Sequence, residues 1–198
     1  VVSSLVAARG MNSAGGPRDK MVGPMPLAED GNTLAPAAEP EGVNGAVNYI
    51  LRFRDAPLDL VGTSSRVFLG VQIQCAQCHD HKTEKWKQDD FRRFASAALH
   101  LQVRPIDKDK VMGIKRVEVT NSAKVLPKVT KDPDTRLIAA AKATALDGTD
   151  LNKGEKTRSE LARWMVSKEN PYFAKAFVNR MWGHFLGRGF SDPVDGLR

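Results

Sequence analysis

Apolar residues recur along much of this chain at the three- and four-residue spacing of amphipathic α-helices. From Leu60 to Cys78 the pattern fits one helical face better than the alternation of a strand, and we predict a helix there. A second helix follows Asp89 or Asp90, since either carboxylate suits an N-cap. Its apolar stripe consists of Phe91, Phe94, Ala95, Ala98 and Leu99. Such stripes are typical of helices with one buried face.

The last third of the chain has the clearest helical signals. An Ala-rich run predicts a helix over 134–146, and Thr157 with Glu160 three residues later forms a capping-box pattern for the next one. Asn170 and Pro171 suit the cap and first turn of a final helix that Gly187 ends. Its predicted buried stripe is Phe173, Phe177, Met181, Trp182 and Phe185. The last two helices are short and adjacent, which predicts a helical hairpin.

The other segments are irregular. Residues 1–9 predict the end of a helix, and the Gly- and Pro-rich passage over 15–40 predicts a long loop. Between 101 and 129 the pattern loosens, which favours either a small β-hairpin near 115–127 or a linker. We therefore predict a mainly α fold with long irregular loops.

Composition narrows the class of protein. The chain has 30 Lys and Arg against 23 Asp and Glu, a net charge of +7 that suits an anionic partner. Aromatic residues at stacking intervals are missing from the basic stretches, so we expect no nucleic-acid binding. No apolar run approaches the roughly 20 residues of a membrane-spanning helix. The chain opens on Val1 without an initiator Met, and we expect it to be part of a longer polypeptide.

Cys75-Ala76-Gln77-Cys78-His79 forms a C-x-x-C-H motif from the only two cysteines of the chain. This is the spacing of c-type haem attachment. Two thiols so placed match the two vinyl groups on one porphyrin edge, and the adjoining imidazole then lies under the iron. The expected cofactor is covalent haem c, with Cys75 and Cys78 as attachment points and His79 as the proximal ligand.

Three other chemistries use similar residues. A thioredoxin-like dithiol would need a βαβ setting, which this passage lacks. A structural zinc site would need four ligands, and Cys75, Cys78, His79 and His81 crowd into seven residues without a second distant pair. A structural disulfide between the two cysteines is the third alternative.

The distal side of the iron decides what such a haem does. His81 is too close in sequence to His79 to reach the far face, so we expect it to support the ligand or to bind a haem propionate. Met112 and His100 are the main candidates for the distal ligand. Weaker candidates are Met165, Met181 and His184. For each of them, packing in the core is the competing role.

A second polar group lies near the end of the sequence. Arg180 and His184 are four residues apart on one helical face, and Asp192 and Asp195 follow the Gly-Arg-Gly turn at 187–189. Such a group suits anion binding or acid–base chemistry. Helix capping and salt bridges are the competing interpretation.

Two passages resemble known signatures. FLGVQIQCAQCHDHKTEKWKQDDFRRFAS, from Phe68, resembles the planctomycete-type cytochrome-c-like domain of unknown function. LARWMVSKENPYFAKAFVNRMWGHFLGRGFSDPVDGLR resembles the opening of the planctomycete-specific domain that regularly follows it. The resemblance implies a mainly helical, exported, multi-domain protein. It divides this chain into the end of a haem-binding domain, 1–132, and a linker with the start of the next helical domain, 133–198.

The resemblance also assigns residues. Matches to the first signature are Cys75, Cys78 and His79 in the haem-binding pattern, and His81, Asp89 and Asp90 in positions of unassigned role. Thr83 and Glu84 replace the small turn residue and the aromatic residue expected after Lys82, which removes an apolar flank for the haem. Matches to the second signature are Asn170, Pro171, Asn179, Arg180, Trp182, His184, Gly187, Arg188, Gly189, Asp192 and Asp195.

These observations favour a monohaem c-type domain that transfers single electrons, with a Lys-rich rim that steers an acidic redox partner. Because haem ligation takes place outside the cytoplasm, we expect the protein in the periplasm or at the cell surface. Two alternatives stay open. One is an enzyme that acts on an anionic or polysaccharide-derived substrate through Arg180, His184 and the nearby aspartates Asp192 and Asp195, with haem as an accessory. The other is a scaffold module without a cofactor.

Overall fold

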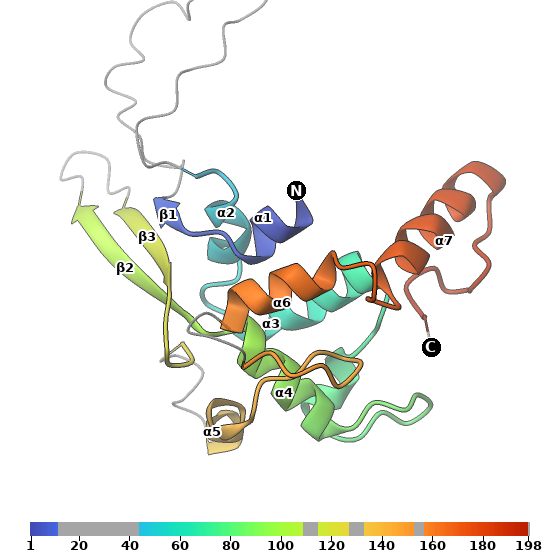
Figure 1. Ribbon diagram of the computed structural model, residues 1–198, viewed down its shortest axis with the longest axis horizontal. Helices are drawn as coiled ribbons and strands as arrows, with labels where there is room; N and C mark the ends of the chain where they lie inside the picture. The colour runs from blue at the N-terminus through green and yellow to red at the C-terminus, as the bar shows by residue number, and fades with distance from the viewer. Residues whose placement is uncertain (12–43, 109–114, 127–132, 153–156, 198) are drawn as a thin grey trace, which may run out of the picture.

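The computed structural model describes residues 1–11, 44–108, 115–126, 133–152 and 157–197. The fold is mainly helical with one small antiparallel sheet, which confirms the predicted class. Figure 1 shows the sheet at one end of the molecule and the last helix, α7, at the other. The predicted loop over 15–40 falls outside the described residues. Among the helices of the described segments, none is long and apolar enough to cross a membrane.

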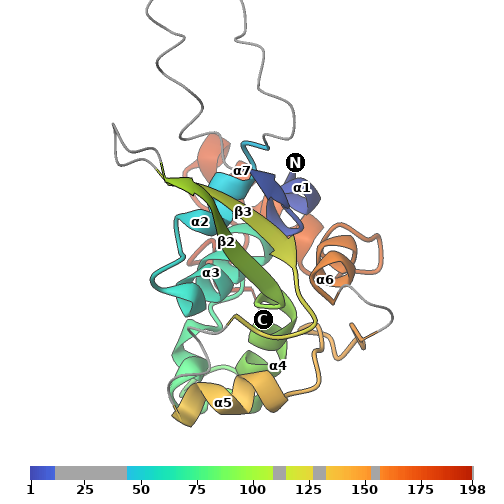
Figure 2. The same ribbon diagram turned by 90° about the vertical axis from the view of Figure 1, so that its left-hand side faces the viewer.

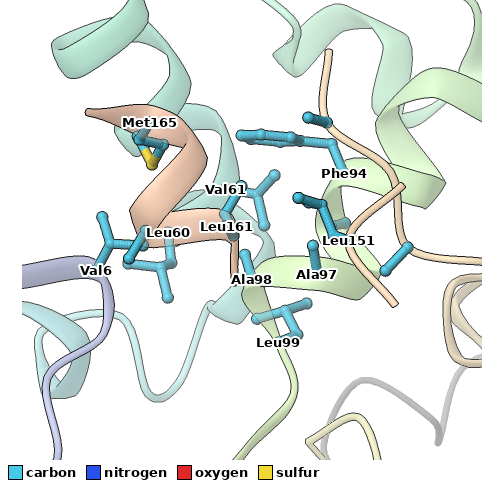
Figure 3. Close-up of a cluster of buried hydrophobic side chains, with 14 of the residues drawn as sticks. Val6, Leu60, Val61, Phe94, Ala97, Ala98, Leu99, Leu151, Leu161 and Met165 are labelled. Carbon is cyan, nitrogen blue, oxygen red and sulfur yellow. The ribbon is translucent and has the colours of Figure 1, made fainter. Parts of the chain in front are cut away.

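The core lies where four helices meet: α1 (Val2–Val6), α3 (Pro57–Ser64), α4 (Gln88–Ala98) and α6 (Thr157–Met165). Figure 3 shows Val6, Leu60, Leu161 and Met165 turned toward one another, with Phe94 and Leu151 on the other side of Val61. Burying such side chains contributes on the order of 1.5–3 kcal/mol each. The core therefore joins residues from the first, middle and last parts of the chain.

The three-stranded sheet has the order β1-β3-β2, with β1 at Gly10–Met11, β2 at Leu101–Lys108 and β3 at Lys115–Asn121. Figure 2 shows β2 and β3 as a twisted antiparallel pair. The predicted hairpin near 115–127 contains β3, but the partner strand precedes it and lies in the passage where the pattern loosened. A register shift between Pro105 and Asp107 accounts for that loosening, because a bulge breaks the alternation.

The prediction of one continuous helix from Leu60 to Cys78 is wrong, because the segment is broken into three shorter elements. The helix α3 ends at Ser64, a π-helical turn η2 covers Ser65–Leu69, and a 3₁₀ turn η3 covers Gln74–Gln77. Gly70 separates the two turns with φ +66°, a left-handed conformation that stops a helix. Leu69, Val71 and Ile73 are buried in alternation, as in an extended chain, whereas Val67, Cys75 and Cys78 of the predicted helical face are exposed. The structure therefore follows the alternating pattern here and not the helical one.

The predicted stripe of α4 is buried as expected. The helix begins one residue before Asp89, so neither aspartate is its cap. Asp90 instead accepts a hydrogen bond from the Lys87 N–H at 2.9 Å, which is the N3 half of a capping box. The Ala-rich helix is shorter than predicted: α5 covers Pro133–Ala140, and a bridge between Thr144 and Asp150 follows. One helix, α2 at Val47–Leu51, has no counterpart in the sequence prediction.

The last helix, α7 (Phe173–Leu186), ends as predicted but begins two residues after Pro171, with Tyr172 rather than Asn170 as its N-cap. The Asn170 side-chain oxygen accepts hydrogen bonds from the N–H groups of Tyr172 and Phe173 at 2.8 and 3.0 Å, and Gly187 ends the helix at φ +83°. Instead of folding back along α6 as a hairpin, α7 extends away from it (Figure 1). It packs on η2.

The stripe predicted to be buried on α7 is mostly exposed. The exposed fractions are 61% for Phe177, 44% for Trp182 and 76% for Phe185, whereas Ala176 and Asn179 are buried. Ala176 lies close to Gly70 at the end of η2, and the Asn179 side chain bonds to the backbone of Ser191 and Val194. Trp182 and Phe190 contact each other, with ring centroids 4.3 Å apart. Amphipathic spacing predicted this helix but not which face it buries.

Candidate functional site

The C-x-x-C-H motif lies on the exposed side of η3. Ala76, between the cysteines, is fully buried, and Ile73 before them is buried as well. The Gln88 side chain at the start of α4 donates a hydrogen bond to the Gln77 carbonyl at 3.2 Å. Cys75 and Cys78 are both exposed, and their thiols are not joined to each other. The buried side chains of Ile73 and Ala76 and the hydrogen bond from Gln88 therefore hold the turn in place, while its two free thiols are exposed to solvent.

His79 and His81 are held in opposite tautomers. The Nδ1 of His79 lies 2.7 Å from the Asp80 carbonyl oxygen, which can only accept, so the proton is on Nδ1, which in the neutral ring leaves Nε2 with its lone pair. The Nδ1 of His81 accepts from the backbone N–H groups of Thr83 and Glu84 at 3.3 and 3.0 Å, which in the neutral ring leaves the proton on Nε2. An Nε2 metal ligand needs the arrangement of His79. His81 is a hydrogen-bond donor through Nε2.

The loop after the motif packs on the C-terminal segment through aromatic residues that the sequence analysis missed. Trp86 and Tyr172 are buried, with ring centroids 6.2 Å apart, and the ammonium of Lys85 lies 4.9 Å from the Trp86 ring. Thr83 and Glu84 depart from the family signature, but Trp86, two residues after Glu84, supplies an apolar contact. That Trp86 follows the motif is visible in the sequence, but its partner Tyr172 is not.

A cleft of about 940 Å³ lies between this loop and the C-terminal segment. Its lining includes His81, Glu84, Lys85, Lys175, Ser191 and Asp192. A smaller hollow of about 260 Å³ is lined by Gly62, Arg66, Gln72, Gln74 and Cys75. Gln72 lines both, so the two hollows adjoin beside the first cysteine.

The zinc and disulfide alternatives find no support in this geometry. Within the described segments, no group of three or more His, Cys, Asp or Glu side chains converges in a way that could hold a metal ion. The cysteines are free rather than bridged. What the motif offers is one histidine and two independent thiols.

The distal candidates lie apart from the motif or outside the described residues. The start of α4 touches the motif through Gln88, and His100 follows the other end of this 11-residue helix, roughly 16 Å away at about 1.5 Å per residue. The His100 ring is half-buried with Nδ1 3.3 Å from the Ser122 carbonyl, and this burial lowers its pKa. Met112 lies outside the described residues. Of the weaker candidates, Met165 is buried in the core and His184 is exposed on α7.

The C-terminal polar residues do not converge on one point. Arg180 donates to the backbone carbonyls of Val67 and Arg66 at 2.7 and 3.3 Å. Asp192 lies 3.5 Å from Arg188, and His184 packs its ring against Phe185. The interpretation of this group as an anion or acid–base site is therefore not supported by the geometry. Capping, the competing role, is what Arg180 performs.

Asp195 is the most buried member of that group. It is 8% exposed and accepts hydrogen bonds from Arg66 Nε and from Gln72 Nε2, the latter at 2.8 Å. Burial alone would raise the pKa of Asp195, but the hydrogen bonds from Arg66 and Gln72 outweigh it and hold that pKa below its ordinary value. The carboxylate is therefore charged at neutral pH and tied to the segment that leads to Cys75.

The fold and the site define a mainly helical chain that joins a C-x-x-C-H segment to a second segment containing α6 and α7. Comparison with protein families identifies both: residues 38–102 match PSCyt2, a protein of unknown function (DUF1549), and residues 157–197 match PSD1, a protein of unknown function (DUF1553). The chain thus carries a cytochrome-like PSCyt2 segment followed by a PSD1 segment, which confirms the resemblance and its order. No curated protein and no solved structure matched the chain. The division at residue 132 stays a prediction.

Proposed function

We propose that this chain binds haem c covalently and transfers single electrons. Cys75 and Cys78 would hold the haem as thioethers, and His79 would bind the iron through Nε2. The observation that carries the proposal is the pairing of two free, exposed thiols with an imidazole whose Nδ1 lies 2.7 Å from a backbone carbonyl. When bound, the haem supplies an iron that changes oxidation state by one electron.

The residues present fit this group as a donor set. Both thiols and the imidazole lie within five consecutive residues, on a turn that the buried Ile73 and Ala76 hold in place. The hydrogen bond at Nδ1 also orients the His79 ring and makes Nε2 a better ligand. All three donor residues are exposed, which suits electron exchange because a partner protein can approach them closely.

The charge beside the motif favours an acidic redox partner. Lys82, Lys85 and Lys87 are exposed on the loop that follows His79. Positive charges around a reaction site raise the rate of encounter with a negative partner, and salt weakens that effect over a Debye length of about 8–10 Å. Reduction by such a partner should therefore slow as salt is added.

The proposal also includes export and further domains. Covalent haem attachment belongs to compartments outside the cytoplasm, so we place the protein in the periplasm or at the cell surface. The PSCyt2 and PSD1 matches support a multi-domain polypeptide.

The test is covalent haem after expression in an exporting host with c-type cytochrome maturation. Wild-type protein should keep haem absorbance and haem-dependent peroxidase staining on a denaturing gel. Cys75→Ala with Cys78→Ala should remove both signals, because no thioether can form. Lys82→Ala is the matched control, since it changes an exposed residue of the same loop and should keep the haem. Colourless wild-type protein from that host would refute the proposal.

A further inference from the structure

The segment that leads into the C-x-x-C-H turn is held by the C-terminal residues. The Asp195 carboxylate accepts hydrogen bonds from Arg66 and, at 2.8 Å, from Gln72, so one buried side chain grips both ends of a seven-residue stretch. Arg180 caps the same stretch by donating to the carbonyls of Val67 and Arg66. Side chains from the PSD1 segment thus bind four groups of the PSCyt2 segment.

The backbone makes the same connection at Gly70. The Leu197 N–H donates to the Gly70 carbonyl at 2.8 Å. A Cβ placed on Gly70 would lie 3.0 Å from a Leu197 methyl carbon and 3.1 Å from the Ala176 Cβ. The glycine therefore allows both a left-handed turn and close contact with the C-terminal segment.

We propose that Arg180, Asp195 and Leu197 form a C-terminal clasp that positions the cysteine turn, with Asp195 as its central positioning residue. Only two residues separate Gln72, which Asp195 holds, from Cys75. Cys75 and the two side chains gripped by Asp195, Arg66 and Gln72, line the same hollow. Release of the clasp thus loosens the wall against which Cys75 lies. The chemical behaviour of the motif in the PSCyt2 segment then depends on the PSD1 segment.

The test measures thiol reactivity in haem-free, reduced protein, made in a host without haem attachment. The alkylation rate of Cys75 is followed by mass spectrometry in the Cys78→Ala background, and that of Cys78 in the Cys75→Ala background. Asp195→Asn keeps the size of the side chain and removes its charge. It should raise the Cys75 rate at least threefold, and the Cys78 rate by less, because Cys75 is the cysteine that lines the hollow.

Asp192→Asn is the matched control. Asp192 lies three residues earlier and is exposed, and its ion pair is with Arg188 rather than with the PSCyt2 segment. The Cys75 and Cys78 rates of this variant should stay within about 1.5-fold of those of the parent protein, because the substitution leaves the contacts of Asp195 and Arg180 in place. Two results would overturn the clasp. In the first, the Cys75 alkylation rate of folded Asp195→Asn protein rises less than threefold. In the second, Asp192→Asn raises that rate by as much as Asp195→Asn does.

A second variant covers the case in which Asp195→Asn does not fold. Arg180→Met removes the caps on the Val67 and Arg66 carbonyls while it keeps the aliphatic part of the side chain, and it should also raise the Cys75 rate. An unchanged rate there would count against the clasp. The haem proposal fails separately, since colourless protein from the maturation host would leave the thiol result standing.

Discussion

At the scale of single residues, backbone contacts give different chemistry to two histidines that are two positions apart. The Asp80 carbonyl places the proton of His79 on Nδ1, whereas two N–H groups place the proton of neutral His81 on Nε2. The ring of His79 is thereby prepared to ligate through Nε2. The neutral ring of His81, which lines the cleft, can donate a hydrogen bond through Nε2.

This difference predicts opposite outcomes for the two substitutions. In haem-loaded protein, His79→Gly should keep the covalent haem but shift its absorbance toward a form that lacks the proximal imidazole, and added imidazole should restore the original spectrum. His81→Asn should leave the spectrum unchanged, because an Asn side chain can still accept the N–H bonds of Thr83 and Glu84. If His81→Asn changed the spectrum and His79→Gly did not, the assignment of the proximal ligand would be wrong.

At the scale of elements, the short connections decide how the site is built. The helices α3 and α4 pack against the cysteine turn and support it. The connection formed by η2, Gly70 and η3 sets the direction in which the two cysteines point. A π-helical turn is often found where function requires a local departure from the α-helix. Here that turn is the one on which α7 packs and which Arg180 caps.

Gly70→Ala tests how much that junction contributes to stability. The substitution adds left-handed strain of about 1–2 kcal/mol and a methyl group in contact with Leu197 and Ala176. Gly148→Ala is the control, because Gly148 also has a positive φ, +89°, but nothing lies within 4 Å of the added carbon. Denaturant unfolding should show that Gly70→Ala loses at least about 1 kcal/mol more than Gly148→Ala. Equal losses would mean that the close contact at Gly70 carries no energy.

The sequence predicted those features of the helices that depend on residues close together in the chain. Phe91 and Phe94 gave α4 its stripe, and Gly187 gave α7 its end, because spacing and left-handed caps are local properties. The break at Gly70 was missed because the apolar residues from Leu60 to Cys78 fit a helical face by spacing, and the alternation of Leu69, Val71 and Ile73 was given less weight. The face of α7 was misassigned because Ala176 rather than Phe177 meets η2, and that choice depends on a partner more than a hundred residues away.

The candidate site was predictable to the same extent. The C-x-x-C-H spacing made Cys75, Cys78 and His79 candidates, since a motif of this kind is local in sequence, and their role stays a prediction. The supporting contacts of Tyr172 with Trp86 and of Asp195 with Arg66 join distant segments, and a single sequence contains no signal for such pairs. Asp195 was noticed as a charge beside Arg180 and His184, but its partner is on the other segment.

At the scale of the whole molecule, the PSCyt2 and PSD1 segments share one core. Leu161 and Met165 of α6 pack with Val6 and Leu60 (Figure 3). Arg158, which is 1% exposed, donates to the Asn121 side chain of β3 and to the Val6 carbonyl. Burial lowers the pKa of this guanidinium to about 10, with a smaller contribution from Arg9, so it stays charged at neutral pH. Leu60 lies in the PSCyt2 match and Leu161 and Met165 lie in the PSD1 match, so apolar packing joins the two segments. Arg158 ties the PSD1 segment to Val6 and Asn121, which lie on either side of the PSCyt2 match.

This arrangement predicts that a cavity made in the PSD1 segment destabilises the PSCyt2 segment equally. Leu161 is 1% exposed, so Leu161→Ala should lower the free energy of unfolding by about 2–5 kcal/mol. Native-state amide hydrogen exchange should show the same loss of protection in α4 as in α6, because one cooperative transition opens both. Val166→Ala is the control, since Val166 is 42% exposed and its truncation should change stability by less than about 0.5 kcal/mol. If Leu161→Ala reduced protection in α6 and left α4 unchanged, the two segments would be separate folding units, and a clasp on the cysteine turn would have to act across a joint between them.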